Sequence, residues 1–370
     1  MNTLDIVKIT LNHAGNGDCV LIESNNSSIL FDGGTASSYE FWKSSILKKG
    51  KLDALVVTHI DNDHVNGVIK LLEDPKAPEI GLVLYNGAEQ ILGLEWSDSP
   101  SQEDKNIDTL AAKFSNIDSE TEIGASEGTS LSYLIKDKDI KQNSEAICIE
   151  SCKQLNIGDF SISVIGPTFE SLRKLKFSWL DVLDEEGIKR KILNKNHSTA
   201  FELYVSNLAN DYLVNVSHDE TENIEALSNY EYTRDTSLTN ESSIALLIRN
   251  NNKSVLEMGD CHIETVISWL DEQHIETLEL DAIKLSHHGS KNNINASFLE
   301  RIKCNKFLIS TNGKKFNHPD HETVSIISKF FPNSEIIIND KVEHITDTFI
   351  QSIYDYNNVK VLLGVKEIEL

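Results

Sequence analysis

Short apolar runs recur along the chain, and polar segments separate them. Most of the runs have the length of a β-strand and are too short for a buried helix. Strand-like runs lie at residues 6–11, 19–23, 28–31, 53–57, 81–85, 146–150, 160–165, 200–205, 243–248, 254–258, 280–285 and 306–310. Helical patterns lie at residues 37–49, 64–72, 110–114, 169–193, 264–273 and 296–302. The mixture of strands and helices predicts an α/β protein.

Three polar stretches interrupt this pattern, at about residues 96–143, 169–195 and 207–239. They are rich in Asp, Glu, Ser, Asn and Lys, and the first two carry helical patterns of their own. Long polar segments between core elements are usually functional loops or insertions. We therefore expect peripheral insertions here.

Length and composition indicate a soluble globular chain. Its 370 residues are 39% hydrophobic, and no apolar run approaches the roughly 20 residues of a membrane span. The first residues lack the basic segment of a secretory signal and pass directly into a strand-like run, so we expect a cytoplasmic protein with no membrane partner. The five cysteines are odd in number and scattered, which fits the cytoplasm and does not suggest a cysteine zinc site.

The formal net charge of −24 argues against an extended surface for duplex DNA. Non-specific binding to nucleic acid depends on Lys and Arg side chains that displace counterions from the phosphates. A small local cradle could still hold a short strand or a nucleotide, and bound cations would neutralise some carboxylates. The acidity also has a plain explanation, because it keeps a protein soluble.

The densest chemical signal is residues 59–64, HIDNDH, which follow a strand-like run and precede a helical pattern. His59, Asp61, Asp63 and His64 would lie together on the connecting loop. Loops at the carboxyl ends of strands carry the chemistry of many α/β proteins. The alternative is a solvated loop whose carboxylates cap the helix.

Three further strand-like runs end in an Asp or a His. Asp32 precedes two glycines, Asp260 follows Gly259, and His287 and His288 precede Gly289. A common sheet edge would bring all of these groups together. Imidazole and carboxylate ligands favour Zn, Mn or Fe over Ca or Mg, and one carboxylate such as Asp260 could bridge two ions. Hydrolysis is the natural reaction class for such a centre.

These residues resemble a known family. Residues 59–64 resemble the HxHxDH signature of the metallo-β-lactamase superfamily, in the HxDxDH form of its competence-related, ComEC-like branch. The other motifs follow in the expected order: Asp32, residues 240–243 (NESS), 259–260 (GD), 287–290 (HHGS), 310–313 (STNG) and 318–319 (HP).

The resemblance implies a fold. It implies a four-layer αβ/βα sandwich formed by one domain, residues 1–370, with the three polar stretches as insertions. The metal site would lie at one edge of the two sheets.

The resemblance also implies the roles of the ligands. His59 and Asp61 would hold one divalent ion, and Asp63 and His64 would hold a second together with His287 or His288. Asp260 would bridge the two ions. Asp32 and Asn240 would lie behind the site, where Asp32 would orient a ligand histidine.

Two departures from the family pattern concern one of the two ions. Asp61 stands where the superfamily has its second histidine, and residues 240–243 occupy the place of a later one. One metal position is therefore poor in ligands. The expectation is one or two divalent ions, with Zn or Mn favoured.

Several residues have expected roles besides metal binding. Asp63 and Asp61 would orient the attacking hydroxide, and His318 would be a general acid or merely shape a turn before Pro319. Of the two adjacent histidines, only one need be a ligand, and the position nearer to the strand favours His287. Three residues are expected to contact substrate, namely Lys284, Ser290 and Asn312.

The sequence therefore favours a metal-dependent hydrolase that acts on phosphodiester bonds, with nucleic acid or a nucleotide as its substrate. One alternative is a non-catalytic metal-binding module that contacts another protein through its acidic insertions. Another is a hydrolase of carboxylic esters, lactones or thioesters.

Overall fold

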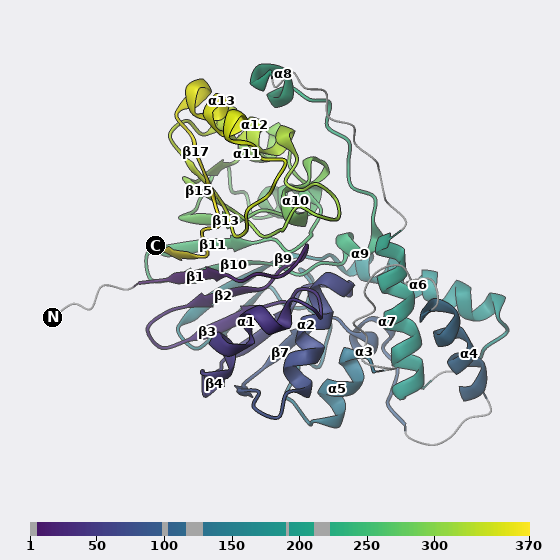
Figure 1. Ribbon diagram of the computed structural model, residues 1–370. Helices are drawn as coiled ribbons and strands as arrows, with labels where there is room; N and C mark the ends of the chain where they lie inside the picture. Colours follow the sequence, from purple (N-terminus) through teal and green to yellow (C-terminus); the bar gives the residue numbers. More distant parts are fainter. Residues whose placement is uncertain (1–5, 98–102, 116–128, 190–191, 211–222) are drawn as a thin grey trace.

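The computed structural model describes residues 6–97, 103–115, 129–189, 192–210 and 223–370. Two mixed sheets lie face to face and helices cover the outer face of each, so the described chain forms four layers (Figure 1). This is the αβ/βα sandwich that the sequence predicts. No helix within the described ranges is long and apolar enough to cross a membrane.

The first sheet has the strand order β18-β1-β2-β3-β5-β7. Its strands are β1 (Lys8–Leu11), β2 (Val20–Glu23), β3 (Ser28–Phe31), β5 (Ala54–Val57), β7 (Val83–Tyr85) and β18 (Glu367–Glu369). β18 to β3 are antiparallel, whereas β3, β5 and β7 are parallel. The carboxyl ends of β3 and β5 therefore meet at one edge.

The second sheet has the order β17-β16-β15-β13-β11-β10-β9-β8. Its strands are β8 (Gln154–Ile157), β9 (Phe160–Gly166), β10 (Ala245–Asn250), β11 (Lys253–Glu257), β13 (Ala282–Lys284), β15 (Lys306–Ile309), β16 (Glu335–Ile338) and β17 (Lys360–Leu363). The strands from β11 to β17 are parallel. Two short pairs stand apart: β4 (Lys51–Leu52) with β6 (Glu79–Ile80), and β12 (Leu278–Glu279) with β14 (Ile302–Lys303).

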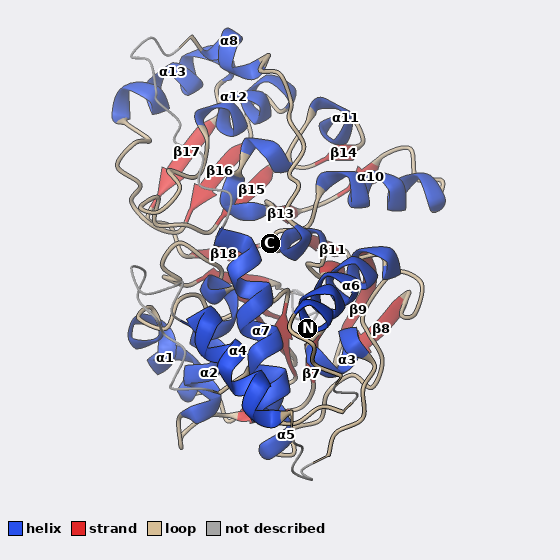
Figure 2. Ribbon diagram, turned by 90° about the vertical axis from the view of Figure 1, so that its right-hand side faces the viewer, coloured by secondary structure: helices blue, strands red, loops and turns tan. Residues whose placement is uncertain are grey.

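Helices of the first half cover the outer face of the first sheet. They are α1 (Tyr39–Leu47), α2 (Asn62–Glu73), α3 (Ala88–Leu92), α4 (Asp104–Ser115), α5 (Leu131–Asp137), α6 (Phe169–Glu185) and α7 (Lys195–Asn210). Figure 2 shows α4, α6 and α7 side by side. The polar stretches thus bury an apolar face of their own, with Ile107, Phe114 and Trp179 in the same core cluster as α1 and α2.

The remaining helices lie mainly over the second sheet. They are α8 (Ile224–Ser228), α9 (Leu238–Glu241), α10 (Ile263–Glu272), α11 (Ala296–Leu299), α12 (His321–Phe330) and α13 (Asp347–Asn357), with two 3₁₀ turns at His287–Gly289 and Lys291–Asn293. Between the sheets, alternate residues such as Ile9, Phe31 and Leu246 form a shared apolar layer.

Two predicted strands are wrong. Residues 200–205 lie within α7, because the apolar positions Ala200, Phe201 and Val205 continue a helical spacing that a six-residue window cannot distinguish from alternation. Residues 146–150 form a turn, where the side-chain amide of Asn86 forms hydrogen bonds with the backbone N–H and C=O of Ile147, both 2.8 Å long. These two bonds replace the ladder of a strand.

Candidate metal centre

The loop between β5 and α2 delivers His59, Asp63 and His64 to the sheet edge. Asp61 is the N-cap of α2, and its carboxylate accepts a hydrogen bond from the N–H of Asn62. Asp63 and His64 then lie in the first turn of the helix, and His59 lies just before the cap. All three side chains are buried.

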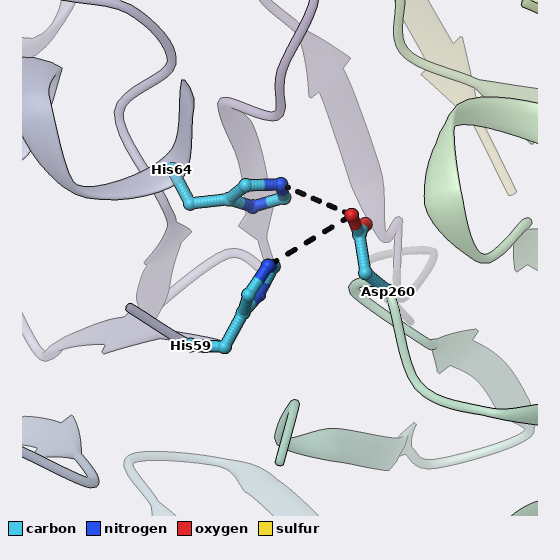
Figure 3. A group of neighbouring side chains, drawn as sticks. All are labelled: His59, His64 and Asp260. Carbon is cyan, nitrogen blue, oxygen red and sulfur yellow. Dashed lines mark ion pairs between the residues drawn. The ribbon is translucent and has the colours of Figure 1, made fainter. Parts of the chain in front are cut away.

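His59, His64 and Asp260 point toward one another across the two halves of the molecule (Figure 3). The Asp260 Oδ2 lies 3.4 Å from Nε2 of His64 and 3.8 Å from Nε2 of His59. Asp260 follows β11 of the second sheet, whereas both histidines follow β5 of the first. The cluster therefore joins the edges of both sheets.

His288 completes this group. Its Nε2 lies 3.6 Å from Asp260 Oδ2 and 3.7 Å from Asp63 Oδ2. Asp63 Oδ1 is in turn 3.8 Å from Nε2 of His64. Five side chains thus present ligand atoms in two overlapping groups of three, namely His59, His64 and Asp260, and Asp63, His64 and His288.

The preference for His287 over His288 is wrong. His287 Nδ1 faces away from the cluster and lies 3.4 Å from Asp235 Oδ2 and 3.1 Å from Asn293 Oδ1. Both histidines have a positive φ, 46° and 54°, so the chain turns sharply after the strand. This turn carries the second histidine, not the first, into the cluster.

The protonation of the histidines suits a metal ion. Ser310 offers only a carbonyl to Nδ1 of His288, at 3.1 Å, and Asp32 offers a carboxylate to Nδ1 of His64, at 2.8 Å. Each Nδ1 therefore donates a proton, which leaves the lone pair of Nε2 for a ligand.

His59 follows the same logic through a hydroxyl group. The Thr58 hydroxyl gives its proton to Asp32 Oδ2, at 2.8 Å, so its oxygen accepts from Nδ1 of His59 at 3.0 Å. Thr58 also donates its backbone N–H to Asp32 Oδ1. Asp32 thus lies behind two ligand histidines and fixes one of them through Thr58, which the sequence did not single out.

Buried atoms without partners show that the group fits a divalent ion. Nε2 of His59, Nε2 of His64 and Oδ1 of Asp260 are buried and form no hydrogen bond with any described residue. Such orphaned atoms are rare unless an ion or water satisfies them. Ligands about 2.1 Å from one tetrahedral ion lie about 3.4 Å apart, close to the observed separations.

The electric field of the site also favours a cation. Burial opposes the charged form of His64, but the carboxylates of Asp260 and Asp32 outweigh burial and raise the pKa of His64 well above its ordinary value. Burial and the neighbouring His64 lower the pKa of His59 to about 3. The buried carboxylates around the imidazoles thus favour a positive charge at this place, which a divalent ion would supply.

Asp18 belongs to the site, although the sequence did not single it out. Its Oδ1 lies 3.3 Å from Nδ1 of His288, and its carboxylate pairs with Lys284. The signal was weak because Asp18 follows no strand-like run. It lies instead in the loop before β2, which packs against Asp63.

The expectation that Lys284 contacts substrate is wrong. Its side chain is completely buried on β13, and its ammonium group pairs with Asp18 and donates to the carbonyl of Gly259 at 3.2 Å. A charge at this depth needs such partners. Lys284 is thus a bridge between the sheets.

Asp61 is not brought to the other ligands. Among the described residues, it belongs to no group of three or more metal-ligating side chains whose ligand atoms lie within 4.8 Å of one another. Its role as helix cap explains this, because its carboxylate is held by the backbone of Asn62 and faces a cavity. Burial and the charge of Asp63 raise the pKa of Asp61 to about 8, against the opposing charge of Lys315.

The remaining predicted residues surround the cluster. His318 lies at its rim, with its ring 5.3 Å from that of His287 and its Nδ1 3.2 Å from Asp320. Asn240 donates to Asp235 at 2.8 Å, a residue that the sequence did not indicate, and contacts His287. Two further predicted residues form hydrogen bonds with the backbone of their own loops.

Those two side chains are Ser290 and Asn312. The hydroxyl of Ser290 accepts from the N–H of Asn292, and the amide oxygen of Asn312 accepts from the N–H of Lys314. These bonds shape turns beside the cluster. Their predicted contact with substrate stays a prediction.

Comparison with solved structures gives only distant similarities. The metallo-beta-lactamase fold protein YhfI from Bacillus subtilis is 10% identical with a TM-score of 0.43, over 99% of both chains. A diphosphatase from the PhnP family is 10% identical with a TM-score of 0.39, over 99% of this chain and 97% of the other. These values support no transfer of activity.

A third solved structure is longer than this chain. CmlA, a diiron beta-hydroxylase from Streptomyces venezuelae, is 12% identical with a TM-score of 0.40, and the chain spans 54% of its length. No curated protein matches the chain.

One family model matches part of the chain. Residues 14–121 match the model of the metallo-beta-lactamase superfamily. This region contains Asp18, Asp32 and the whole of residues 59–64, which supply one half of the cluster. Over these residues the chain is similar to the metallo-beta-lactamase superfamily.

Proposed function

We propose that the protein is a metal-dependent hydrolase of phosphodiester bonds that acts on nucleic acid or on a nucleotide. The observation that carries the proposal is the convergence of three imidazole Nε2 atoms with the carboxylates of Asp63 and Asp260. When bound there, a divalent ion such as Zn or Mn would activate a water molecule for attack and polarise the phosphoryl oxygen.

The residues of the chain divide the remaining tasks. His59, His64 and His288 would hold the ion through Nε2, while Asp32, Thr58 and the carbonyl of Ser310 fix their orientation. Asp63 Oδ2 also accepts from the side chain of Asn16 at 2.5 Å, which holds this carboxylate toward the centre. A carboxylate that was free to rotate would bind the divalent ion less tightly.

The rim of the site supports a phosphate-bearing substrate. His318 lies beside His287, outside the ligand cluster, where it could protonate a leaving oxygen. Lys315 is near enough to Asp61 for its charge to affect the pKa of that residue. The preference for phosphodiesters also rests on the ComEC-like form of the motif. Asp61 lies outside the cluster, so we favour one ion over two.

Metal analysis and a turnover assay test the proposal together. The purified protein should contain close to one equivalent of a first-row metal and should hydrolyse bis(p-nitrophenyl) phosphate. Asp260→Ala and His64→Ala should lose metal and reduce turnover by at least about 100-fold, since loss of a supporting residue alone costs 10 to 100-fold. Asp271→Ala and His274→Asn change exposed residues and are the matched controls.

The alternatives predict different outcomes. Metal without turnover of any ester would favour a non-catalytic metal-binding module, whose acidic insertions contact a protein partner. Cleavage of a lactone or a carboxylic ester, but of no phosphodiester, would favour a hydrolase of carboxylic esters, lactones or thioesters. A protein that binds neither Zn nor Mn would contradict the whole proposal.

A further inference from the structure

A cavity of about 220 Å³ lies beside the metal centre, beneath the helices of the polar stretches. One wall is a face of α2, with Asn62, Val65, Asn66 and Ile69 at helical spacing. The facing wall is a stripe of α7, with Thr199, Glu202, Leu203 and Ser206 at the same spacing. Two helix faces that would normally pack together instead enclose a space.

The composition of these faces is unusual for a buried interface. The stripe of α7 is polar at three of its four positions, Thr199, Glu202 and Ser206, although all three are buried. A stripe that faces a protein core is normally apolar, because buried polar groups are costly without partners. Stability alone therefore does not explain the lining.

One hydroxyl in the lining lacks a partner. Thr199 is 7% exposed, and its Oγ1 forms no hydrogen bond with any described residue. Glu202, by contrast, accepts from the backbone N–H groups of Leu131 and Ser132 at 2.8 and 3.0 Å. Thr199 is thus a buried polar group in the cavity wall that a ligand could satisfy.

The lining also restricts the charge of a ligand. The described residues that line the cavity include the carboxylates of Asp61 and Glu202 but no Lys, Arg or His. A phosphate or a carboxylate would find no cationic partner among these residues, whereas hydroxyl groups would find both donors and acceptors. The side chains of Ile60, Val65, Ile69 and Leu203 offer an apolar surface for a ring.

The cavity connects to the chemistry through Asp61. Asp61 lines the cavity and caps α2, while Asp63 and His64 in the next turn reach the metal cluster. A substrate with its phosphoryl group at the cluster would place a neighbouring group here. At about 220 Å³, the space is smaller than the roughly 300–1,000 Å³ of a whole-ligand site and suits one ring.

We propose that this cavity is a subsite for an uncharged, hydroxyl-bearing ring of the substrate, that is, a sugar, free or as part of a nucleoside. The inference deepens the proposed function and rests on it for the position of the phosphoryl group. Thr199 and Glu202 would contact the hydroxyl groups, and Ile69 and Leu203 would contact the face of the ring.

Calorimetric titration of the full chain with thymidine, D-ribose and inorganic phosphate tests the subsite without turnover. Thymidine should bind saturably, and Thr199→Val should weaken its binding about fivefold, the effect of one neutral hydrogen bond. Leu203→Trp should fill the cavity and weaken binding by more than about tenfold. Thr323→Val is the matched control, because it removes a buried hydroxyl without a described partner from α12.

Each outcome decides the inference separately from the hydrolase proposal. Binding of both thymidine and ribose would assign the cavity to the sugar, and binding of thymidine alone would assign it to a nucleoside. The inference is overturned if neither binds, if Thr199→Val and Leu203→Trp both bind thymidine like the wild type, or if the cavity variants affect phosphate instead. Turnover of bis(p-nitrophenyl) phosphate would survive that result, because this substrate contains no sugar.

Discussion

At the scale of single residues, the centre depends on which atom of each side chain is already engaged. Every ligand histidine has Nδ1 occupied, by Thr58, Asp32 or the carbonyl of Ser310, and this leaves Nε2 for the ion. Motif spacing locates the histidines but contains no information about the Nδ1 partners. Thr58 acts through its hydroxyl group and Ser310 through its backbone carbonyl. Such groups are too common in any sequence to be recognised as partners of a ligand histidine.

Asp32→Asn should weaken metal binding by about 10 to 100-fold while the fold is kept. Asp32 has φ 55°, a conformation that Asn tolerates, and the amide can still accept from Thr58. The lost negative charge makes His64 a weaker ligand. Competition with a chromogenic chelator would measure the affinity, with the exposed Asp271→Asn as control. Equal affinities for wild type and Asp32→Asn would contradict this role.

Gly17→Ala should disturb the same centre through the backbone. A Cβ atom at Gly17 would lie 1.7 Å from the carbonyl oxygen of Asp63, so the loop must move. We expect a loss of about 1–3 kcal/mol in the free energy of unfolding, together with weaker metal binding. At Gly50 an added Cβ meets no atom within 4 Å, so Gly50→Ala is the control for thermal unfolding. A Gly17→Ala protein as stable as Gly50→Ala would show that the loop yields freely.

At the scale of elements, the helices of the polar stretches form part of the core. Trp179 of α6 is fully buried, and its ring lies 5.8 Å from Phe201 of α7 and 6.4 Å from Phe114 of α4. Aromatic clusters of this kind contribute much of the stability of a helical layer. The charged residues of α4 and α6 conceal this in the sequence, because they outnumber the buried apolar residues of the same helices.

Trp179→Ala should lower the free energy of unfolding by about 3–5 kcal/mol, the usual cost of such a cavity. Phe177→Ala, on the same helix, removes a side chain that is 50% exposed and should change stability by less than about 0.5 kcal/mol. Urea unfolding of both variants would measure the difference. Similar losses would mean that α6 is held by its exposed face instead.

The local pattern of apolar residues predicts most of the elements around the site, and it also predicts the loops that carry the ligands. β5, α2, β11 and β13 lie where the apolar runs indicate, and Asp32, residues 59–64, Asp260 and the histidine pair lie at their ends. The pattern fails where the deciding contact is distant. Asp18 enters the site because its loop packs on Asp63, and His288 enters because of a turn in left-handed backbone.

At the scale of the whole molecule, the cluster and the charges beside it link the two sheets. The loops after β3 and β5 supply Asp32, His59 and His64, whereas those after β11 and β13 supply Asp260 and His288. The pair of Asp18 and Lys284 makes a second link, since Asp18 precedes β2 and Lys284 lies on β13. An ion at the cluster would therefore hold both halves of the sandwich.

Removal of metal should consequently lower the melting temperature of the whole chain. An ion present at 100 times its dissociation constant adds about 2.7 kcal/mol to the folded state, which corresponds to a shift of about 3–4 °C in a chain of this size. The carboxylates of Asp63 and Asp260 would face the imidazoles without a divalent partner, so EDTA should cause this decrease and added Zn or Mn should reverse it. Differential scanning calorimetry of wild type and His64→Ala separates a specific ion from surface binding, because the variant should melt at the same temperature with and without metal. An equal metal-dependent shift in both proteins would place the stabilising ion on the acidic surface, away from the edge that the two sheets share.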